Sequence, residues 1–525
     1  MRLVSILLLG ALSSCTKDGT PLTGISSFHV TVTGVNGKPP PAADAPLPAN
    51  TGATLDTWDF EIEARTPEGK PNAFDGIVRL SVRPGAVLGV QGDGAVARNI
   101  HMKGGKASGK VTVTAVYGPT RLWVEDVGYA PADPSKKAQC ENGKNDDPDD
   151  DVLVDYPNDP GCAFADDDSE AEGTYAAGVS PPVHYALPRL SDIQGHASET
   201  PYPFEGIEVK VDPPQHVIVT RVSSDGFYVT DIDPAEVTGG YNSLFAFNFN
   251  TPARMRICDR VTYLAGTVNE FFGFTELSFP SYRLDFPIEG QEECEIPEPT
   301  VIRRKVLADD IAMEKLESGL VRIENFHVAS KFGPKPVEKN VPDADHSSCD
   351  LNGDGQVDFQ SPDEGGCSDV CAADPECSEW TTFSARGNYK GYFTECSEDQ
   401  PKPCTKDTDC STGTCVMSAC ATDLAPKACA TDKDCKTGTC TIGGQIQIQT
   451  GTISAFDPTA HKGDTLKGVT GTMRNFSGGS LNWTIETRCP DDLSCDGAGC
   501  VPEPLSSKAA CVRLRTDSDN DQGTN

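Results

Sequence analysis

The sequence predicts an all-β protein of several domains, and three observations carry this prediction. At 525 residues the chain is long enough for about three or four domains of roughly 150 residues each. Apolar and polar residues alternate with a period of two in several short runs, as in residues 58–65, which is typical of strands with one buried face. The chain also contains 50 Gly and 40 Pro, so turns separate these runs at short intervals.

Composition and charge exclude several classes of protein. With 37% hydrophobic and 7% aromatic residues, the chain is too apolar to be disordered. The formal net charge of −34 excludes a nucleic-acid binder that works through overall positive charge. No apolar run of membrane-spanning length follows the first 15 residues, which excludes a polytopic membrane protein.

The N-terminus predicts export and lipid anchoring. Arg2 precedes a short apolar stretch, residues 3–12, that is too short to span a bilayer. The stretch ends in L-S-S-C at 12–15, which resembles a bacterial lipobox, and the next residue is not Asp, which implies an outer-membrane lipoprotein facing the periplasm or the cell surface. The alternative is an ordinary secretory signal with an accidental Cys. The resemblance implies lipidation of Cys15, a signal peptide at 1–15 and a tether at 16–24.

Cysteine usage agrees with an oxidising compartment. Removing Cys15 from the 21 cysteines leaves an even number, so all the others can form disulfides. Two segments, beginning at Cys404 and Cys429, share the spacing C-x5-C-x4-C. No His lies near them, so disulfides are favoured there over a zinc site.

Residues 25–131 are predicted to form a β-sandwich. Trp58, Phe60, Ile62 and Ala64 alternate with charged residues, and Gly, Pro and Asn clusters separate several short runs of this kind. The segment resembles a bacterial immunoglobulin-like domain, although it contains no Cys. The resemblance implies a spacer or an adhesive module, and we expect a stalk that lifts the rest of the chain off the membrane.

Two acidic loops predict structural calcium sites. In the first, within an acidic linker predicted at 132–183 and bracketed by Cys140 and Cys162, carboxylates occupy positions 1, 3, 5 and 9. These ligands are Asp147, Asp149, Asp151 and Asp155. The second loop has oxygen ligands at the same positions and Gly at position 6, and its ligands are Asp350, Asn352, Asp354 and Asp358. Many flexible oxygen ligands suit Ca²⁺ better than Mg²⁺.

Both loops resemble the calcium loops of EF-hand, dockerin and thrombospondin type 3 repeats. Position 12, where an EF-hand has a bidentate Glu, is Asn158 in the first loop and Ser361 in the second. Neighbouring carboxylates, Asp159 or Asp363, would have to substitute. No clear helices flank either loop. The alternative is that both are solvated acidic linkers without a metal.

Residues 184–300 carry the most specific motif order. The chain reads L-S-D-I-Q-G at 190–195, G-F-Y-V-T-D at 226–231 and C-D-R-V-T-Y-L-A-G-T-V-N-E-F-F-G-F-T-E-L at 258–277. These motifs resemble the OB-fold module attached to bacterial extracellular nucleases, which implies a small β-barrel. Cys258 replaces a Gly of that pattern, and Cys294 is its nearest possible disulfide partner.

A weaker second copy of this module is predicted at 301–490. Residues 320–328 resemble its first strand, and 463–473 and 483–490 resemble its last two strands. Two insertions, at about 333–378 and 397–441, hold the second calcium loop and the cysteine repeat. A Cys-containing tail at 491–525 closes the chain.

Aromatic residues predict a ligand-binding face on the first OB-like module. OB folds bind oligonucleotides or oligosaccharides on one face, and bases and sugar rings both stack on aromatic side chains. Phe271 and Phe272 are adjacent, so in a strand one of them must point outward. With Tyr282 and Arg283 they form the predicted contact surface. The alternating phenylalanines are assigned instead to packing inside the barrel: Phe245, Phe247 and Phe249.

The motif inventory predicts a protein without catalytic activity. The chain has no H-E-x-x-H pair, no G-x-S-x-G elbow and no G-x-x-x-x-G-K-[ST] loop. The leading hypothesis is a lipid-anchored envelope or surface protein that binds an extracellular polymer, either a glycan or a single-stranded nucleic acid. One alternative is a structural or assembly role with envelope-protein partners, in which the insertions cover the OB face. Another is an accessory role beside a secreted nuclease or hydrolase.

Overall fold

The computed structural model divides the chain into two compact units, residues 1–186 and 187–525, and each unit is described by itself. The described residues are 25–51, 55–129, 136–146, 152–159, 176–211, 216–285, 294–307, 309–328, 388–393, 395–396, 445–451, 463–475 and 483–512, with short pieces within 162–170, 331–332, 377–378, 408–420, 440–442 and 453–461. Among them, no helix is long and apolar enough to cross a membrane. Strands dominate both units, so the predicted all-β, multidomain class is confirmed.

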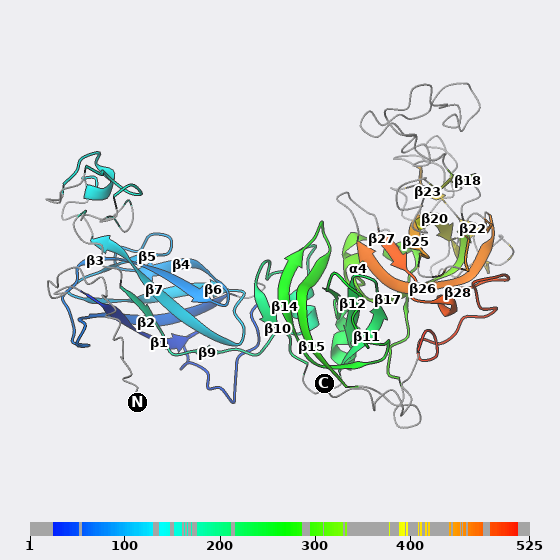
Figure 1. Cartoon of the computed structure of the whole chain (residues 1–525), viewed down its shortest axis with the longest axis horizontal. Helices are drawn as coiled ribbons and strands as arrows, with labels where there is room; N and C mark the ends of the chain where they lie inside the picture. Colours follow the sequence, from blue (N-terminus) through cyan, green and yellow to red (C-terminus); the bar gives the residue numbers. More distant parts are fainter. Residues whose placement is uncertain are drawn as a thin grey trace, which may run out of the picture. The chain divides into compact units, whose positions relative to one another are not determined.

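The first unit is a nine-stranded sheet whose two halves face each other across one core (blue to cyan in Figure 1). Its strands are β1 (Ser27–Val35), β2 (Asp56–Arg65), β3 (Gly76–Arg83), β4 (Ala86–Gly92), β5 (Asn99–Met102), β6 (Lys106–Thr114), β7 (Pro119–Tyr129), β8 (Ala177–Val179) and β9 (Val183–His184). The strand order is β4-β6-β2-β1-β8-β7-β3-β5, with β9 beside β7. A short 3-10 helix, η1 (Gln139–Glu141), lies between β7 and β8.

Side-chain alternation explains why this sheet folds on itself. In β2, Trp58, Phe60 and Ile62 are buried and Glu61 is exposed, which confirms the predicted period of two. These side chains share one hydrophobic cluster with Leu80 of β3 and others from the facing half. Burying each apolar side chain of this size contributes roughly 1.5–3 kcal/mol to stability. Burial of apolar side chains between the two halves of the sheet therefore holds the halves together.

Two short strands extend the first unit beyond the predicted boundary at residue 131. β8 pairs antiparallel with β7, and its first residue pairs with Ser27 of β1. Gly178 in β8 has no room for a side chain, because a Cβ would lie 2.2 Å from the carbonyl oxygen of Phe28. The chain between β7 and β8 is therefore an insertion within this sheet, and the predicted linker at 132–183 includes strands of the first unit instead of following it. Strands of three and two residues are too short for alternation to reveal them.

The first barrel, residues 187–299, opens the second unit (green in Figure 1). Its elements are α1 (Leu190–Gln194), β10 (Gly206–Glu208), β11 (Val217–Val222), β12 (Gly226–Asp231), α2 (Pro234–Gly239), β13 (Ser243–Phe247), β14 (Arg260–Glu270) and β15 (Thr275–Asp285). The order β10-β14-β11-β12-β13-β15 closes because β14 also pairs with β15. Only the β13–β15 pair among these is parallel.

The second barrel, residues 300–512, repeats this circular order. Its elements are β16 (Thr300–Val301), α3 (Arg304–Leu307), α4 (Asp310–Glu314), β17 (Leu320–Val328), β20 (Asn388–Phe393), β25 (Gln445–Gln449), β26 (Thr465–Asn475), β27 (Trp483–Glu486), η6 (Pro490–Asp492) and β28 (Leu493–Ser494). The ring is β17-β20-β25-β27-β26, closed by β17–β26, and again the pair β25–β27 is parallel. β17 coincides with the predicted strand at 320–328.

Short two-stranded ladders lie in the two insertions of the second barrel. They are β18 (Lys331–Phe332) with β19 (Cys377–Ser378), β21 (Glu395–Cys396) with β22 (Cys415–Val416), and β23 (Ser418–Cys420) with β24 (Cys440–Ile442). Each unit contains disulfides between its own cysteines. They are Cys140–Cys162 in the first unit and, in the second, Cys258–Cys294, Cys396–Cys410, Cys489–Cys511 and Cys495–Cys500. The predicted Cys258–Cys294 bridge is confirmed. The predicted tail at 491–525 begins inside the second barrel, because β28 pairs with β26.

Candidate functional site

The outer face of the first barrel carries a buried aromatic cluster. Side chains alternate along β12 and β13, so Tyr228 and Phe245, which are register partners, share one face of the sheet. Their ring centroids lie 4.7 Å apart, and the Phe245 and Phe274 centroids lie 5.6 Å apart. All three rings are fully buried and form a cluster of their own. We expected Phe245 to pack inside the barrel, but it belongs to this outer face.

The second barrel covers this aromatic face with charged side chains. Glu486 of β27 accepts a hydrogen bond from Tyr228 Oη at 2.8 Å and forms an ion pair with the buried Arg221 of β11. Arg474 of β26 lies 3.3 Å from the other Glu486 oxygen, and its guanidinium carbon lies 5.4 Å and 5.2 Å from the Phe245 and Phe274 ring centroids. Cation–π contacts and a paired carboxylate thus close the face to ligands.

Burial sets the electrostatics of this junction. It raises the pKa of the Tyr228 hydroxyl, so this group stays protonated and donates its hydrogen bond. It also lowers the pKa of the Arg221 guanidinium, because desolvation disfavours the charged form. Glu486 is the carboxylate that offsets the burial of the two arginines, Arg221 and Arg474.

The aromatic row continues past the covered face into solvent. The Phe245 and Phe247 centroids lie 6.3 Å apart, Phe247 and Phe249 lie 4.3 Å apart, and Phe249 and Phe279 lie 5.5 Å apart. Phe247 is half-buried, whereas Phe249 is 60% and Phe279 68% exposed. We call Phe247, Phe249 and Phe279 the aromatic edge. The expectation that Phe249 fills the barrel is not met.

Backbone conformation marks the same exposed phenylalanines. Phe249 has φ = 57° and Phe279 has φ = 54°, and the exposed Phe204 and Phe272 have φ of 63° and 54°. A bulky residue with positive φ is strained by roughly 1–2 kcal/mol. Strain of this kind persists where the surroundings fix it, and it clusters at binding sites.

The predicted contact residues fall into two separate places. Phe271 and Phe272 lie in the turn between β14 and β15 rather than in a strand, where Phe271 and Phe274 exchange backbone hydrogen bonds of 2.9 and 3.1 Å. Both side chains are exposed, and their centroids lie 4.8 Å apart. Positive φ at Phe272 and Gly273 is the pattern of a type I′ turn.

Tyr282 and Arg283 lie far along β15 from that turn. Thr275 opposes Glu270 at the turn and Tyr282 opposes Leu264, so roughly 20 Å of strand separates the two pairs. Tyr282 packs edge-on against the buried Phe227, with centroids 5.0 Å apart, and burial raises its pKa. Arg283 lies over the Tyr263 ring at 4.8 Å. The four residues do not form one surface.

Most predicted calcium ligands and the lipidation site Cys15 lie outside the described residues. The exception among the ligands is Asp155; those outside are Asp147, Asp149, Asp151, Asp350, Asn352, Asp354 and Asp358. The Asp155 carboxylate accepts from the Gly143 backbone N–H at 2.9 and 3.0 Å. The backbone N–H groups of Asp146 and Asp155 donate to the buried Glu170 carboxylate. The two cysteines that bracket the loop in the sequence, Cys140 and Cys162, form a disulfide.

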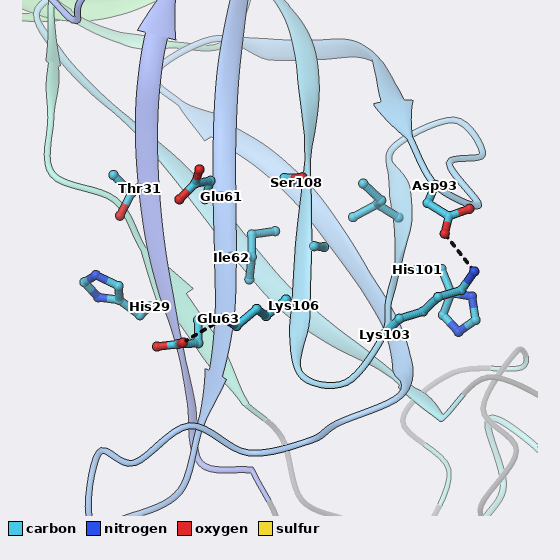
Figure 2. Close-up of a pocket in the computed structure, with 12 residues that line it drawn as sticks. His29, Thr31, Glu61, Ile62, Glu63, Asp93, His101, Lys103, Lys106 and Ser108 are labelled. Carbon is cyan, nitrogen blue, oxygen red and sulfur yellow. Dashed lines mark hydrogen bonds and ion pairs between the residues drawn. The ribbon is translucent and has the colours of Figure 1, made fainter.

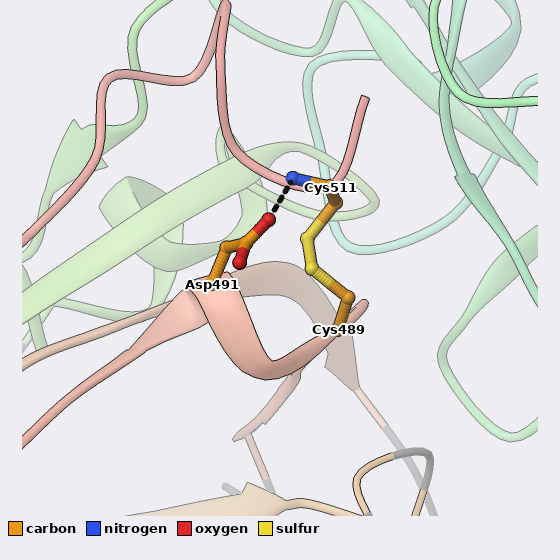
Figure 3. Close-up of side chains that lie close together, drawn as sticks. All are labelled: Cys489, Asp491 and Cys511. Atoms are coloured by element: carbon orange, nitrogen blue, oxygen red, sulfur yellow. Dashed lines mark hydrogen bonds between the residues drawn. A yellow bond between two sulfur atoms is a disulfide. The ribbon is translucent and has the colours of Figure 1, made fainter. Parts of the chain in front are cut away.

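Acidic and cysteine side chains come together in two groups whose cysteines are in disulfides. In Figure 3, Cys489 and Cys511 form a disulfide, and the Cys511 backbone N–H donates to Asp491 at 2.9 Å. In the other group, Cys162 lies near Asp159 and Glu170 but is bridged to Cys140. Sulfur in a disulfide is not a thiolate, so neither group offers a cysteine ligand.

A polar groove lies on the first unit, formed by β1, β2, β6 and the β4–β5 region (Figure 2). Lys103 pairs with Asp93 at 2.7 Å, and Lys106 lies 3.9 Å from Glu63. Its lining also includes His29 but no Phe, Tyr or Trp. The charged residues of the groove therefore largely pair with one another, and the groove offers no aromatic ring on which a ligand could stack. The aromatic edge is the stronger candidate for a ligand-binding site.

Sequence reasoning missed the junction residues and the aromatic edge. A signal for the junction was present: β13 reads S-L-F-A-F, which is apolar on both faces and therefore typical of a strand covered on both sides. What covers it, Arg474 and Glu486, lies more than 200 residues away in the chain and has no local signature. Neither the protein-family models nor the curated proteins compared with this chain match it.

Proposed function

We propose that this chain is a lipid-anchored, non-catalytic envelope protein that binds an extracellular glycan at the aromatic edge. One observation carries the proposal: the row of rings leaves the covered face and ends in Phe249 and Phe279, which are exposed and held at positive φ. Sugar rings stack on such side chains without charge neutralisation. A phosphate polymer would need counter-charge, and the net charge of −34 opposes its approach.

Sheet order supports the proposed module types. With β1, β2, β6 and β4 in one half and β8, β7 and β3 in the other, the first unit has the A-B-E-D and G-F-C order of an immunoglobulin sandwich, with β5 added beside β3. Each barrel is a closed ring of five strand positions with Greek-key connections, as in OB folds. We propose that the sandwich serves as a stalk for the barrels.

The proposal is tested with the oxidised mature protein, without lipid, on immobilised neutral and acidic polysaccharides. The double variant Phe249→Asn/Phe279→Asn removes both rings while Asn tolerates positive φ, so the fold is kept. We expect at least a tenfold loss of glycan binding, because two ring contacts of about 1 kcal/mol each are removed.

Phe204→Asn provides the matched control. Phe204 is 79% exposed and also has positive φ, but it makes no ring contact with the aromatic edge among the described residues. Its loss should leave glycan binding within twofold. Equal losses in both variants, or no binding to any polysaccharide, would reject the proposal, and salt-sensitive binding to single-stranded DNA instead would place the protein among nucleic-acid binders.

We also propose calcium in the two acidic loops. Next to the first loop, Asp155 accepts from the Gly143 backbone N–H, and Glu170 accepts from those of Asp146 and Asp155, which supports a carboxylate-rich turn at this place. The disulfide Cys140–Cys162 closes the same segment. A small loop with little core gains stability from a metal together with such a bridge.

A structural role with protein partners is the second candidate. Its prediction was that the insertions cover the OB face and that no polymer binds there. Burial of the β12–β13 face of the first barrel under Glu486 and Arg474 of the second barrel supports this candidate. On this proposal the paired barrels act as one scaffold, and glycan binding at the aromatic edge is absent.

A further inference from the structure

A buried carboxyl group from the second barrel reaches into the first. Glu317, between α4 and β17, is 1% exposed. Its Oε1 accepts from the Thr275 backbone N–H at 3.1 Å and from the Gln194 amide. Thr275 begins β15 and Gln194 ends α1, so Glu317 connects two elements of the first barrel to the second barrel.

Glu270 and Glu314 bring two more carboxyl groups to the same place. Glu270 accepts from Thr275 Oγ1 at 2.9 Å and from the Thr200 backbone N–H at 3.1 Å, so it shares Thr275 with Glu317. Burial raises the pKa of all three carboxyl groups, that of Glu314 to about 7, and the charge of Glu270 raises the pKa of Glu314 and Glu317 further. In the described part of the chain, none of these three carboxylates forms an ion pair with Lys, Arg or His.

Three buried oxygen atoms at this junction have no hydrogen-bond partner. They are Glu317 Oε2, Glu270 Oε1 and Gln194 Oε1. Gln194 is 3% exposed, and its amide nitrogen is held against Glu317, so its amide oxygen also lies within the group. A buried acceptor without a donor is unfavourable, and buried like charges need a compensating cation. Carboxylate and amide oxygens are the ligands of hard divalent cations.

We propose that the barrel junction binds a divalent cation, Ca²⁺ by the chemistry of its donors, through Glu317, Glu270 and Gln194. The site is separate from both acidic loops. Ca²⁺ accepts six to eight oxygen ligands in flexible geometry, including bidentate carboxylates, whereas Mg²⁺ demands near-ideal octahedral geometry, so two carboxylates and an amide from three separate elements fit Ca²⁺ better. The ion would tie α1 and the β14–β15 hairpin to the segment that enters the second barrel, and it would offset the negative charge gathered there.

The test uses the full oxidised chain in which both acidic loops are disabled by Asp149→Asn, Asp151→Asn, Asp350→Asn and Asp354→Asn. Equilibrium dialysis against Ca²⁺ alone, and against Mg²⁺ alone, counts the remaining sites. We expect one remaining Ca²⁺ per chain, with Mg²⁺ bound at least tenfold more weakly. Adding Glu317→Gln should weaken Ca²⁺ binding at least tenfold, because the side chain keeps its shape and loses its charge.

Glu199→Gln is the matched control. Glu199 is exposed and acts on Glu270 only through its charge, so its neutralisation should change Ca²⁺ affinity by less than twofold. If Glu317→Gln does not fold, Glu270→Gln must show the same tenfold loss. No Ca²⁺ on the loop-disabled chain, equal effects of Glu199→Gln and Glu317→Gln, or unchanged Ca²⁺ affinity with a more stable Glu317→Gln chain would each overturn the proposal. The last result would mean that protons neutralise the junction.

Discussion

The two barrels share one strand order but differ in the outer face of the third strand of the ring, which is β13 in the first barrel and β25 in the second. In the first barrel, β13 reads S-L-F-A-F and its outward Phe245 is fully buried under the second barrel. In the second barrel, β25 reads Q-I-Q-I-Q, with Ile446 and Ile448 buried and Gln447 partly exposed. Both strands pair in parallel with the last strand of their ring, so the positions are equivalent.

This difference teaches how one topology serves two tasks. Alternating Gln and Ile suit a strand with one buried and one solvent-exposed face. A strand with apolar residues on both faces needs other residues to cover its outer face as well. The second barrel supplies that layer through β26 and β27, and the pairing is directional because the polar face of β25 offers no equivalent aromatic surface. What remains for a ligand on the first barrel is the aromatic edge, where this cover ends.

Removing Glu486 is the strongest way to break the pairing of the barrels. Glu486→Ala leaves Arg221 buried and without its carboxylate, which costs about 4 kcal/mol. We expect the free energy of unfolding of the second unit to fall by that amount, measured by pulse proteolysis in urea. The control Glu503→Ala removes an exposed partner of Lys467 and should change stability by less than ~1 kcal/mol. Similar values for both variants would show that Glu486 does not hold the junction.

Truncating the middle residue of the equivalent strands compares the two faces directly. Phe245→Ala opens a cavity between the barrels and should cost about 3 kcal/mol. Gln447→Ala, at the matching position of β25, should change the free energy of unfolding by less than ~0.5 kcal/mol, because its side chain meets solvent. Urea midpoints of the two variants and the parent protein give the comparison. A large loss in Gln447→Ala would mean that the second barrel's face is covered as well.

Long alternating strands were predictable from the sequence, whereas contacts between distant segments were not. β2 and β17 each run for nine or ten residues, long enough for a period of two to identify them. β8 has three residues and is held by pairing with β1 and β7, so no local pattern marks it. The Cys258–Cys294 pair was predictable because the two cysteines close one module.

The candidate site was only partly predictable. The sequence singled out aromatic residues of the first barrel, but Phe271 and Phe272 were assigned to a strand and lie in a turn. A Phe-Gly turn with positive φ at both residues breaks the usual preference for Asn-Gly, so local propensity pointed away from it. The roles of Phe245 and Phe249 depend on where the second barrel stops, which is set by tertiary packing.

The disulfides of the two barrels sharpen the comparison with the smallest expected effect. Cys258–Cys294 in the first barrel spans 36 residues, and Cys495–Cys500 in the second spans 5. Because the entropy that a cross-link removes from the unfolded chain grows with the logarithm of loop length, replacing the first pair by Ala should cost about 2 kcal/mol more than replacing the second. Urea unfolding of the two double variants, each folded under oxidising conditions, measures this difference.

A reversed order in that measurement would be equally informative. Cys258 and Cys294 pack with Ile218, Ile296 and Leu320, where the first barrel meets the first strand of the second. Ala at both positions removes two buried sulfur atoms from this cluster, so packing loss adds to the entropy term in the same direction. If replacing the short Cys495–Cys500 bridge nevertheless cost more unfolding free energy, the second unit would begin to unfold at the end of the second barrel. The junction between the barrels would then unfold later, and variants at the junction would measure the stability of that later step.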